Sequence, residues 1–265
     1  MTFARFKALH HGAEPLLLPC AWDHASAAAL ARAGFAAVGT TSLGVAAAAG
    51  KPDAGRATRR ETTALARSIA GLEVPVSVDI EDGFHRDPGE VADLVAELAG
   101  LGVAGVNLED GRGAGLAETG TQARLIGVIK RQVPGVFLNA RTDAFWLGLP
   151  GAPALARARV RAYADAGADG VFVPGASTER DIETLVTEAG VPVNVLVQRE
   201  IPVRGLAELG VARISYGSLL FRTALHAAVT TALEIAAGEP VPDGVPSYEQ
   251  VEALHRYGRG DLRSP

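Results

Sequence analysis

The sequence predicts an α/β protein built as a single (β/α)₈ barrel, the TIM-barrel fold. Its 265 residues suit one large barrel domain. Eight short apolar segments recur along the chain, and a helical pattern follows most of them. Strands that alternate with helices form a parallel sheet, and eight such units close into a barrel, with a doubly wound open sheet as the alternative. Four glycines mark helix ends just before an apolar segment: Gly34, Gly102, Gly167 and Gly210.

The expected elements follow one another regularly. Strands are predicted at residues 16–19, 37–41, 76–80, 105–109, 136–141, 170–174, 191–197 and 212–217. Helices are predicted at roughly 24–33, 60–70, 88–99, 121–131, 154–166, 178–189, 204–209 and 219–237. We expect residues 1–240 to form the barrel. Residues 241–265, with the short helix-like stretch SYEQVEALHRYG, are expected to pack as a tail on the barrel or on a neighbouring subunit.

The composition argues against several classes of partner. A formal net charge of −5 and a pI near 5.7 give no basic surface for nucleic acid or for an anionic membrane. The single cysteine, Cys20, excludes an internal disulfide and suits a reducing compartment; we expect it to be a small residue packed under the barrel mouth. We see neither a signal-type start nor an apolar run of about 18 residues, so we expect a cytoplasmic protein.

Three acidic residues lie at the ends of two apolar strands, in the stretches VSVDIEDG and GVNLED. Alternate residues of a strand share a face, so Asp79 and Glu81 should point the same way. Two parallel strands joined by one helix should then bring Asp79, Glu81 and Glu109 together. Each acid alone would be a solvated loop residue or a helix cap, but three together repel one another unless a cation compensates them. The cluster therefore predicts a Mg²⁺ site, with Mn²⁺ as the other candidate.

The carboxyl ends of barrel strands carry the chemistry of this fold, and here they are rich in polar groups. Besides the three acids, they offer one cation and several hydroxyl and amide groups. Such a set suits a small anionic, oxygen-rich ligand held to a metal. The residues concerned are Trp22, Asp23, Thr41, Ser42, Leu43, Arg141, Asp143, Asn194 and Gln198.

The chain resembles the isocitrate lyase and phosphoenolpyruvate mutase superfamily from about residue 16 to the end of the eighth helix. The resemblance rests on motifs that occur in order on the predicted strands: PCAWDHASA, GTTSLGVAAAAGKPD, VDIEDG, GVNLED, LNARTD and VPVNVLV. Each motif alone is weak, but their order and spacing on eight βα units are specific. The resemblance implies a Mg²⁺-dependent enzyme of the barrel fold.

The resemblance also implies roles for individual residues. The superfamily's metal acids fall on Asp79, Glu81 and Glu109, with some metal contacts made through water. Its substrate carboxylate is held by backbone N–H groups at Thr41, Ser42 and Leu43, although the two hydroxyl residues could equally cap the following segment. Three further positions match the superfamily's site, namely the catalytic acid Asp53, the arginine Arg141 and, more weakly, Asn194 for a distal carboxylate.

Two of these positions have a structural alternative. Asp53 stands in KPDAG and could be a turn residue, and Arg141 could form an ion pair with Asp143. In the functional interpretation, Arg141 pairs with a developing enolate oxygen or with a carboxylate.

One motif of the superfamily is missing. Isocitrate and methylisocitrate lyases carry a Lys-Lys-Cys-Gly-His motif after the fourth strand, where this chain reads LEDGRGAGLAETG. The loop has no cysteine, lysine or histidine, and the lysine and asparagine of the phosphonate branch are absent too. Arg112, Glu118 and Thr119 are its polar substitutes. The short, glycine-rich loop suits a mobile lid or plain disorder.

Three function classes follow. The first is a carbon–carbon lyase acting on a small 2-oxo or 2-hydroxy di- or tricarboxylic acid through a metal-stabilised enolate, resembling isocitrate lyase or an oxaloacetate decarboxylase. The second is a 2-oxo-acid binding protein of the same fold with little catalysis. The third and weakest is a phosphosugar isomerase or aldolase. The resemblance implies a homodimer or homotetramer in which a terminal helix is exchanged.

Overall fold

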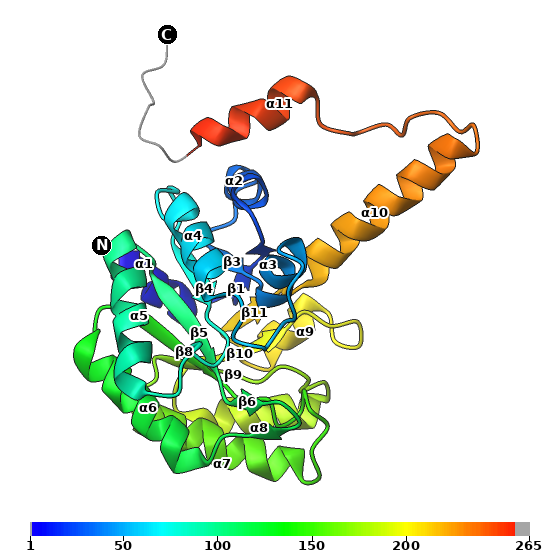
Figure 1. Cartoon of the computed structure of the whole chain (residues 1–265). Coiled ribbons are helices and arrows are strands. Elements are labelled where there is room, and N and C mark those ends of the chain that lie inside the picture. The colour runs from blue at the N-terminus through cyan, green and yellow to red at the C-terminus, as the bar shows by residue number, and fades with distance from the viewer. Residues whose placement is uncertain (1, 258–265) are drawn as a thin grey trace.

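The computed structural model describes residues 2–257, so the last residues of the predicted tail, 258–265, lie outside the described part. Its main sheet is parallel and runs in the order β1-β11-β10-β9-β8-β5-β4-β3-β2 (Figure 1). The strands are β1 (Leu16–Leu18), β2 (Cys20–Ala21), β3 (Val38–Thr40), β4 (Val76–Asp79), β5 (Gly105–Glu109), β8 (Phe137–Arg141), β9 (Gly170–Phe172), β10 (Val193–Leu196) and β11 (Arg213–Ser215).

The two end strands of this order, β1 and β2, are halves of one segment interrupted at Pro19. Proline has no N–H to give to a sheet ladder, so the segment changes partners there. Leu16 pairs with Arg213 of β11, whereas Cys20 pairs with Gly39 of β3. The ladder thereby closes, and the predicted (β/α)₈ barrel is confirmed.

Helices surround the barrel and connect its strands. The predicted ones are present with ends shifted by a few residues: α2 (His24–Arg32), α4 (Arg59–Ile69), α5 (Pro88–Leu101), α6 (Thr119–Gln132), α7 (Ala152–Asp165), α8 (Glu179–Ala189), α9 (Val203–Glu208) and α10 (Leu219–Ala236). The sequence analysis did not predict α3 (Ser42–Ala48), α1 (Thr2–Ala8) with the 3₁₀ turn η1 (Leu9–His11), or the hairpin β6 (Gly111–Arg112) and β7 (Gly115–Leu116).

Helix α1 closes the amino-terminal end of the barrel. Phe6 is fully buried and meets Phe137 edge to face, with ring centroids 5.4 Å apart. His10 stacks on the same ring at 4.1 Å and its Nδ1 contacts the Phe6 carbonyl at 2.8 Å. A Cβ at Gly105 would lie 2.7 Å from the Phe6 ring, so only glycine leaves room for this plug. Leu16, Leu18, Ala37 and Ala104 complete the apolar cluster.

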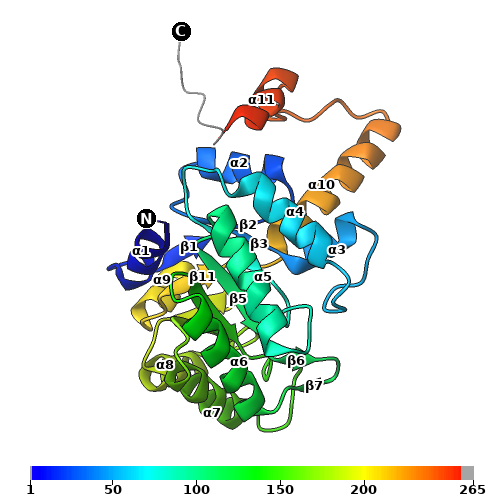
Figure 2. The same ribbon diagram turned by 60° about the vertical axis from the view of Figure 1, so that its left-hand side comes forward.

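The carboxyl-terminal part leaves the barrel along α10 and returns through α11 (Tyr248–Glu252) and the 3₁₀ turn η2 (Ala253–Arg256). Figure 2 shows α10 projecting from the barrel and α11 lying beside α2. His24 Nε2 contacts the Leu254 carbonyl at 3.2 Å. Helix α10 is 18 residues long with a mean hydropathy of 1.2, enough to span a membrane by length and composition alone. Our expectation that the chain has no apolar run of about 18 residues was therefore wrong. The alanines of α10 keep its mean hydropathy high in spite of its few charged residues.

Candidate active site

A pocket of about 620 Å³ opens at the carboxyl ends of the barrel strands. Seven predicted site residues line it: Thr41, Ser42, Leu43, Asp53, Asp79, Glu109 and Arg141. Two other predicted residues, Glu81 and Asn194, do not line it. The structure thus brings most of the candidate set, contributed by five different strand ends and loops, around one cavity.

Asp79 is a buried carboxylate at the end of β4. It is 8% exposed and accepts a hydrogen bond from the Glu81 backbone N–H at 3.2 Å. Within residues 2–257, no lysine or arginine forms an ion pair with it. Burial raises the pKa of Asp79, the charge of Arg141 opposes that shift, and the charge of Asp53 adds to it. This acid is therefore electrostatically under-compensated.

Glu109 and Asp143 share one arginine. Arg141 Nη1 lies 3.0 Å from Glu109 Oε2, and its Nε donates to Asp143 Oδ1 at 2.7 Å. Burial raises the pKa of Glu109 to about 8 despite the attraction of Arg141, because Asp79 and Asp143 repel its charge. The Arg141–Asp143 pair, our structural alternative for Arg141, is present. Arg141 nevertheless lines the pocket, so both interpretations apply to the same side chain.

Glu81 does not take the direction that strand alternation predicted. Strand β4 ends at Asp79, and Glu81 has a left-handed backbone with φ of +50°. Its carboxylate accepts hydrogen bonds from the Arg56 N–H at 3.0 Å and from the Thr58 hydroxyl at 2.7 Å. The alternation argument failed here because it applies only while the strand continues. Glu81 therefore holds the loop that carries Asp53 instead of facing the cavity.

A divalent cation fits the acids that remain. No three histidine, cysteine or acidic side chains in residues 2–257 already form a metal-binding cluster. However, Asp79 has no cation partner among the described residues, and Asp53, Asp79 and Glu109 repel one another. Carboxylates around water are the donor set that Mg²⁺ prefers, because this ion retains several of its waters. Asp79 and Glu109 could hold it directly, with Asp53 acting through water.

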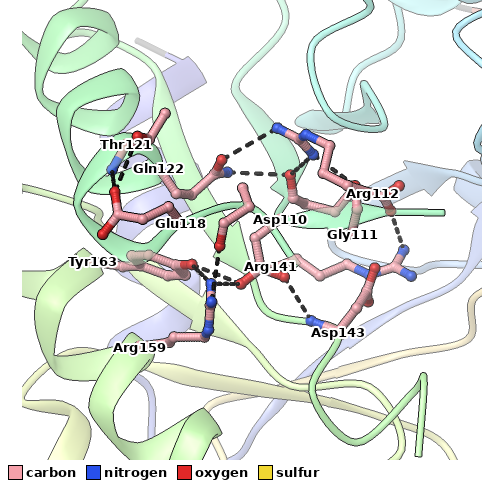
Figure 3. Close-up of polar contacts among 12 residues, drawn as sticks. Asp110, Gly111, Arg112, Glu118, Thr121, Gln122, Arg141, Asp143, Arg159 and Tyr163 are labelled. Atoms are coloured by element: carbon pink, nitrogen blue, oxygen red, sulfur yellow. Dashed lines mark hydrogen bonds and ion pairs between the residues drawn. The ribbon is translucent and has the colours of Figure 1, made fainter. Parts of the chain in front are cut away.

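A second acid network is centred on Asp110, directly after β5, and includes Arg159 and Tyr163 of α7 (Figure 3). Asp110 is fully buried and accepts hydrogen bonds from Arg159 Nη1 at 2.8 Å and the Tyr163 hydroxyl at 2.6 Å. It also accepts one from the backbone N–H of Asp143 at 2.9 Å. Through Asp143 this network positions Arg141. The sequence analysis missed it, although the Glu109-Asp110 doublet places two acids on opposite faces of one strand.

The loop after β5 is an ordered hairpin, β6–β7, in which Gly111 pairs with Leu116. Arg159 Nη2 anchors it by donating to the Ala117 carbonyl at 2.8 Å. A Cβ at Gly111 would lie 2.5 Å from Asp143 Oδ2, so glycine is needed there. Only Gly111 and Gly113 of the hairpin line the pocket.

The hairpin's polar side chains serve other contacts. Arg112 donates to the Gly111 carbonyl and lies 3.4 Å from Asp82. Glu118 caps α6 by accepting from the backbone N–H groups of Gly120 and Thr121. Neither Arg112, Glu118 nor Thr119 lines the pocket, so none of them stands in for the missing lyase motif at the cavity wall.

The opposite wall of the pocket carries both apolar and polar side chains. The apolar ones come from the loop after β8, from β9 and β10 with their loops, and from the start of α10: Trp146, Leu147, Phe172, Pro174, Leu196, Val197 and Leu219. Gln198, Arg199 and Arg222 are polar residues of the same lining. Asn194 lies one layer below Leu196 on β10, is 1% exposed, and neither of its amide atoms has a partner in residues 2–257. Cys20 lies at the floor, as expected for a packed residue, and burial raises the pKa of its thiol to about 11.

Comparison with known proteins identifies relatives along most of the chain. Residues 6–236 match the sequence profile described as phosphoenolpyruvate phosphomutase. An uncharacterised protein of Mycobacterium tuberculosis is 43% identical over 94% of this chain and 95% of its own length. The 2,3-dimethylmalate lyase of Eubacterium barkeri is 32% identical over 69% of this chain and 67% of its own length. The crystal structure of phosphoenolpyruvate phosphomutase from Streptomyces platensis subsp. rosaceus superimposes with a TM-score of 0.84 at 25% identity, covering 95% of this chain and 94% of that one.

Proposed function

Because the chain belongs to the phosphoenolpyruvate phosphomutase family, within the isocitrate lyase and phosphoenolpyruvate mutase superfamily of lyases and mutases acting on carboxylic acids, we propose a Mg²⁺-dependent carbon–carbon lyase. Its substrate is a small 2-oxo or 2-hydroxy di- or tricarboxylic acid. A bond to the carbon beside the 2-oxo or 2-hydroxy group breaks, and one product forms as an enolate. Both an isocitrate-lyase-like cleavage and an oxaloacetate-type decarboxylation fit this description.

One observation carries the proposal. Asp79, a buried carboxylate without an ion-pair partner in the described residues, lines the same pocket as Glu109 and the buried cation Arg141. A buried charge is costly unless it is paired, so this arrangement indicates a site built for a ligand that completes its charge balance. A divalent cation together with an organic acid would do so.

The metal would be held by Asp79 and Glu109, with Asp53 contributing through water; Mn²⁺ could replace Mg²⁺. Glu81 would act only indirectly, by holding the loop that carries Asp53. When bound, the metal supplies a positive charge that polarises the carboxylate and 2-oxo oxygens of the acid.

The chain's own groups would bind and orient the acid. The backbone N–H groups of Ser42 and Leu43 open helix α3 at the pocket and lack intrahelical partners, so they can hold a carboxylate. Thr41, at the start of this helix, makes no side-chain cap, which leaves its hydroxyl available to the acid. Arg141 would donate to the oxygen on which negative charge develops.

Asp53 is the proton acceptor that we propose for cleavage of a 2-hydroxy acid. It lines the pocket and is exposed. The Asp53 carboxylate would take the hydroxyl proton as the hydroxyl carbon becomes a carbonyl, and the electrons of the broken carbon–carbon bond would pass to the departing acid. For decarboxylation no such base is needed, because the bond electrons pass directly into the enolate.

The lining of the opposite wall suits two kinds of substrate. Phe172, Leu196 and Leu219 would desolvate a methyl or ethyl substituent. Arg199 and Arg222 line the same pocket and would attract a further carboxylate. Asn194 could reach a distal carboxylate only through water, since it is buried below Leu196.

A 2-oxo-acid binding protein is the second candidate, and the hairpin favours it. Only glycines of β6–β7 line the pocket, so this lid offers no side chain that could protonate a leaving enolate. A protein with such a lid could hold an acid and release it unchanged.

The test is a combined thermal-shift and product screen in Mg²⁺ with oxaloacetate, isocitrate, methylisocitrate, alkyl-substituted malates, pyruvate and 2-oxoglutarate. A lyase would be stabilised by an acid and would consume it, and Asp53→Ala or Arg141→Ala would reduce turnover by orders of magnitude while Mg²⁺ still binds. Stabilisation without any product, abolished by Asp79→Ala, would contradict the lyase and support the binding protein.

We also propose that the protein is a cytoplasmic homodimer or homotetramer. The part of α10 that leaves the barrel exposes Leu225, Val229, Leu233 and Ile235, an apolar surface that a second subunit would cover. Light scattering after size exclusion measures the assembly directly. A monomer at micromolar concentration would contradict this proposal.

A further inference from the structure

The pocket floor rests on a buried arginine with no acidic partner. Arg213 is 1% exposed, and none of the ion pairs among residues 2–257 includes it. Its Nε donates to the Ser215 hydroxyl at 2.9 Å and its Nη2 to Asn107 Oδ1 at 3.1 Å, while Nη1 has no partner. Burying a guanidinium without an acidic partner costs free energy of folding. Stability therefore does not explain why Arg213 lies here in contact with Asn107.

Asn107 receives two hydrogen bonds on the same atom. Asn139 Nδ2 also donates to Asn107 Oδ1, at 2.9 Å. A guanidinium carries donors only, so the Asn107 atom that Arg213 contacts must be the oxygen. The arginine therefore decides which end of the Asn107 amide is oxygen and which is nitrogen.

The other end of this amide is free. Asn107 lines the pocket, and its Nδ2 makes no hydrogen bond within residues 2–257. That nitrogen is also not among the polar atoms shut off from solvent without a partner, unlike both amide atoms of Asn194. The pocket floor thus presents an N–H donor that is oriented from below and accessible from the cavity.

The position of this donor matches the acid cluster above it. Asn107 pairs in register with Asp79 and lies on the same face of β5 as Glu109. An uncharged donor placed there can contact an oxygen of an anionic ligand. Because it carries no charge, it does not compete with Arg141 or with a metal for the carboxylates of the acid cluster. The positive charge of Arg213 below also favours an anion in the pocket.

We propose that Asn107 is a substrate-binding residue. Its Nδ2–H donates to a carboxylate or 2-oxo oxygen of the acid in the pocket, and Arg213 and Asn139 hold the amide in that orientation. The class of ligand rests on the function proposed above, whereas the donor and its orientation rest on the hydrogen bonds alone. The same reasoning makes Arg213 a positioning residue, since it acts on the ligand through Asn107.

Asn107→Asp separates this role from a structural one. Aspartate still accepts hydrogen bonds from Arg213 and Asn139, so the fold should be retained and its melting temperature maintained or raised. It has no N–H to donate and adds a negative charge at the floor. Asn107→Ala removes the donor without adding charge. Ser77→Ala is the matched control, because Ser77 is a buried polar residue of the neighbouring strand that does not line the pocket.

The measurement is calorimetric titration of each metal-loaded protein with oxalate, with malonate and with pyruvate, together with its melting temperature. We expect Asn107→Ala to raise the dissociation constant about tenfold and Asn107→Asp to raise it further. Ser77→Ala should bind as the wild type does.

Two results would overturn the inference. If Asn107→Asp keeps its fold and binds all three acids with wild-type affinity, Asn107 is structural only, and the proposed function survives. If the wild type itself binds none of the acids, the donor has no ligand and the proposed function fails with it.

Discussion

The two ends of the barrel treat polar groups in opposite ways. At the amino-terminal end, Phe6 and Phe137 close the barrel with an apolar plug, and His10 is stacked against it without charge. At the carboxyl-terminal end, Asp79 and Glu109 face a cavity with raised pKa values. One end lowers the free energy of the fold, whereas the other retains charges that the fold alone does not balance. The difference indicates where this chain has been built for binding instead of for stability.

The largest effect is expected from Asp79→Asn at the cavity. Turnover should fall by about 10³-fold, because the proposed metal would lose a negatively charged ligand and the substrate would lose the charge of the metal. The melting temperature of the metal-free protein should stay the same or rise, since an unbalanced buried charge is removed. Steady-state kinetics and calorimetry measure both. A large loss of stability would show that Asp79 is a structural acid and would break the comparison between the ends.

Phe6→Ala tests the opposite end. We expect a loss of about 3 kcal/mol in the free energy of unfolding, because a fully buried aromatic ring leaves a cavity against Gly105 and Phe137. The measurement is urea unfolding at pH 7, and kcat should be unchanged at temperatures where the variant is folded. Phe3→Ala on the same helix is the control, and its smaller burial predicts a smaller loss.

Tyr163→Phe tests what determines the role of an acid at the carboxyl-terminal end of the barrel. The role could depend on the position of the acid at this end or on whether its charge is paired. Asp110 lies at the same end as Glu109, yet it is bonded to Tyr163, Arg159 and the Asp143 backbone. Removing the hydroxyl should cost about 2 kcal/mol of stability, with a modest effect on turnover through Arg141. Tyr248→Phe, at an exposed tyrosine, should change neither quantity. If Tyr163→Phe leaves stability unaltered, the network does not anchor this region.

His10 gives the smallest effect, and it depends on pH. Burial lowers the pKa of His10 from 6.5 to about 3, so the folded state holds it neutral while the unfolded state takes up a proton below pH 6.5. Its contribution to stability is thus complete above pH 6.5 and is lost progressively toward pH 3. His10→Phe keeps the ring stack but has no group that takes up a proton. Between pH 7 and pH 5.5 the wild type should lose about 1 kcal/mol more of its free energy of unfolding than His10→Phe loses. Identical pH dependence in both proteins would show that His10 is solvated.

Much of the fold was predictable from the sequence. The apolar strands and the glycines that end helices recur in the alternation typical of βα units, so eight strands and the helices between them were located within a few residues. Helix α1 was missed because its role appears only in three dimensions. Helix α1 is only seven residues long, and its sequence TFARFKA does not indicate that Phe6 fills the bottom of the barrel.

The candidate site was predictable where strand geometry determines it. Asp79, Glu109 and Arg141 follow from the rule that strand ends meet at one end of the barrel, and they line one pocket. Strand-end position also selected the segment from Thr41 to Leu43, and the resemblance supplied its role and Asp53. All of these residues line the pocket. Glu81 departs from the expectation because its backbone turns left-handed directly after the strand, and the hydrogen bonds to the 56–58 loop that hold it there are not local.

By itself, the sequence determined the class of fold, the end of the barrel that carries chemistry and the acidic character of the site, because alternation and βα periodicity are local properties of the chain. Tertiary structure alone decided that Asp110, the neighbour of Glu109, is bonded to Arg159 and Tyr163 of α7. It also decided that Asn107 presents its nitrogen to the pocket. These outcomes depend on Arg159 and Arg213, which are distant in sequence and become partners only when the barrel closes.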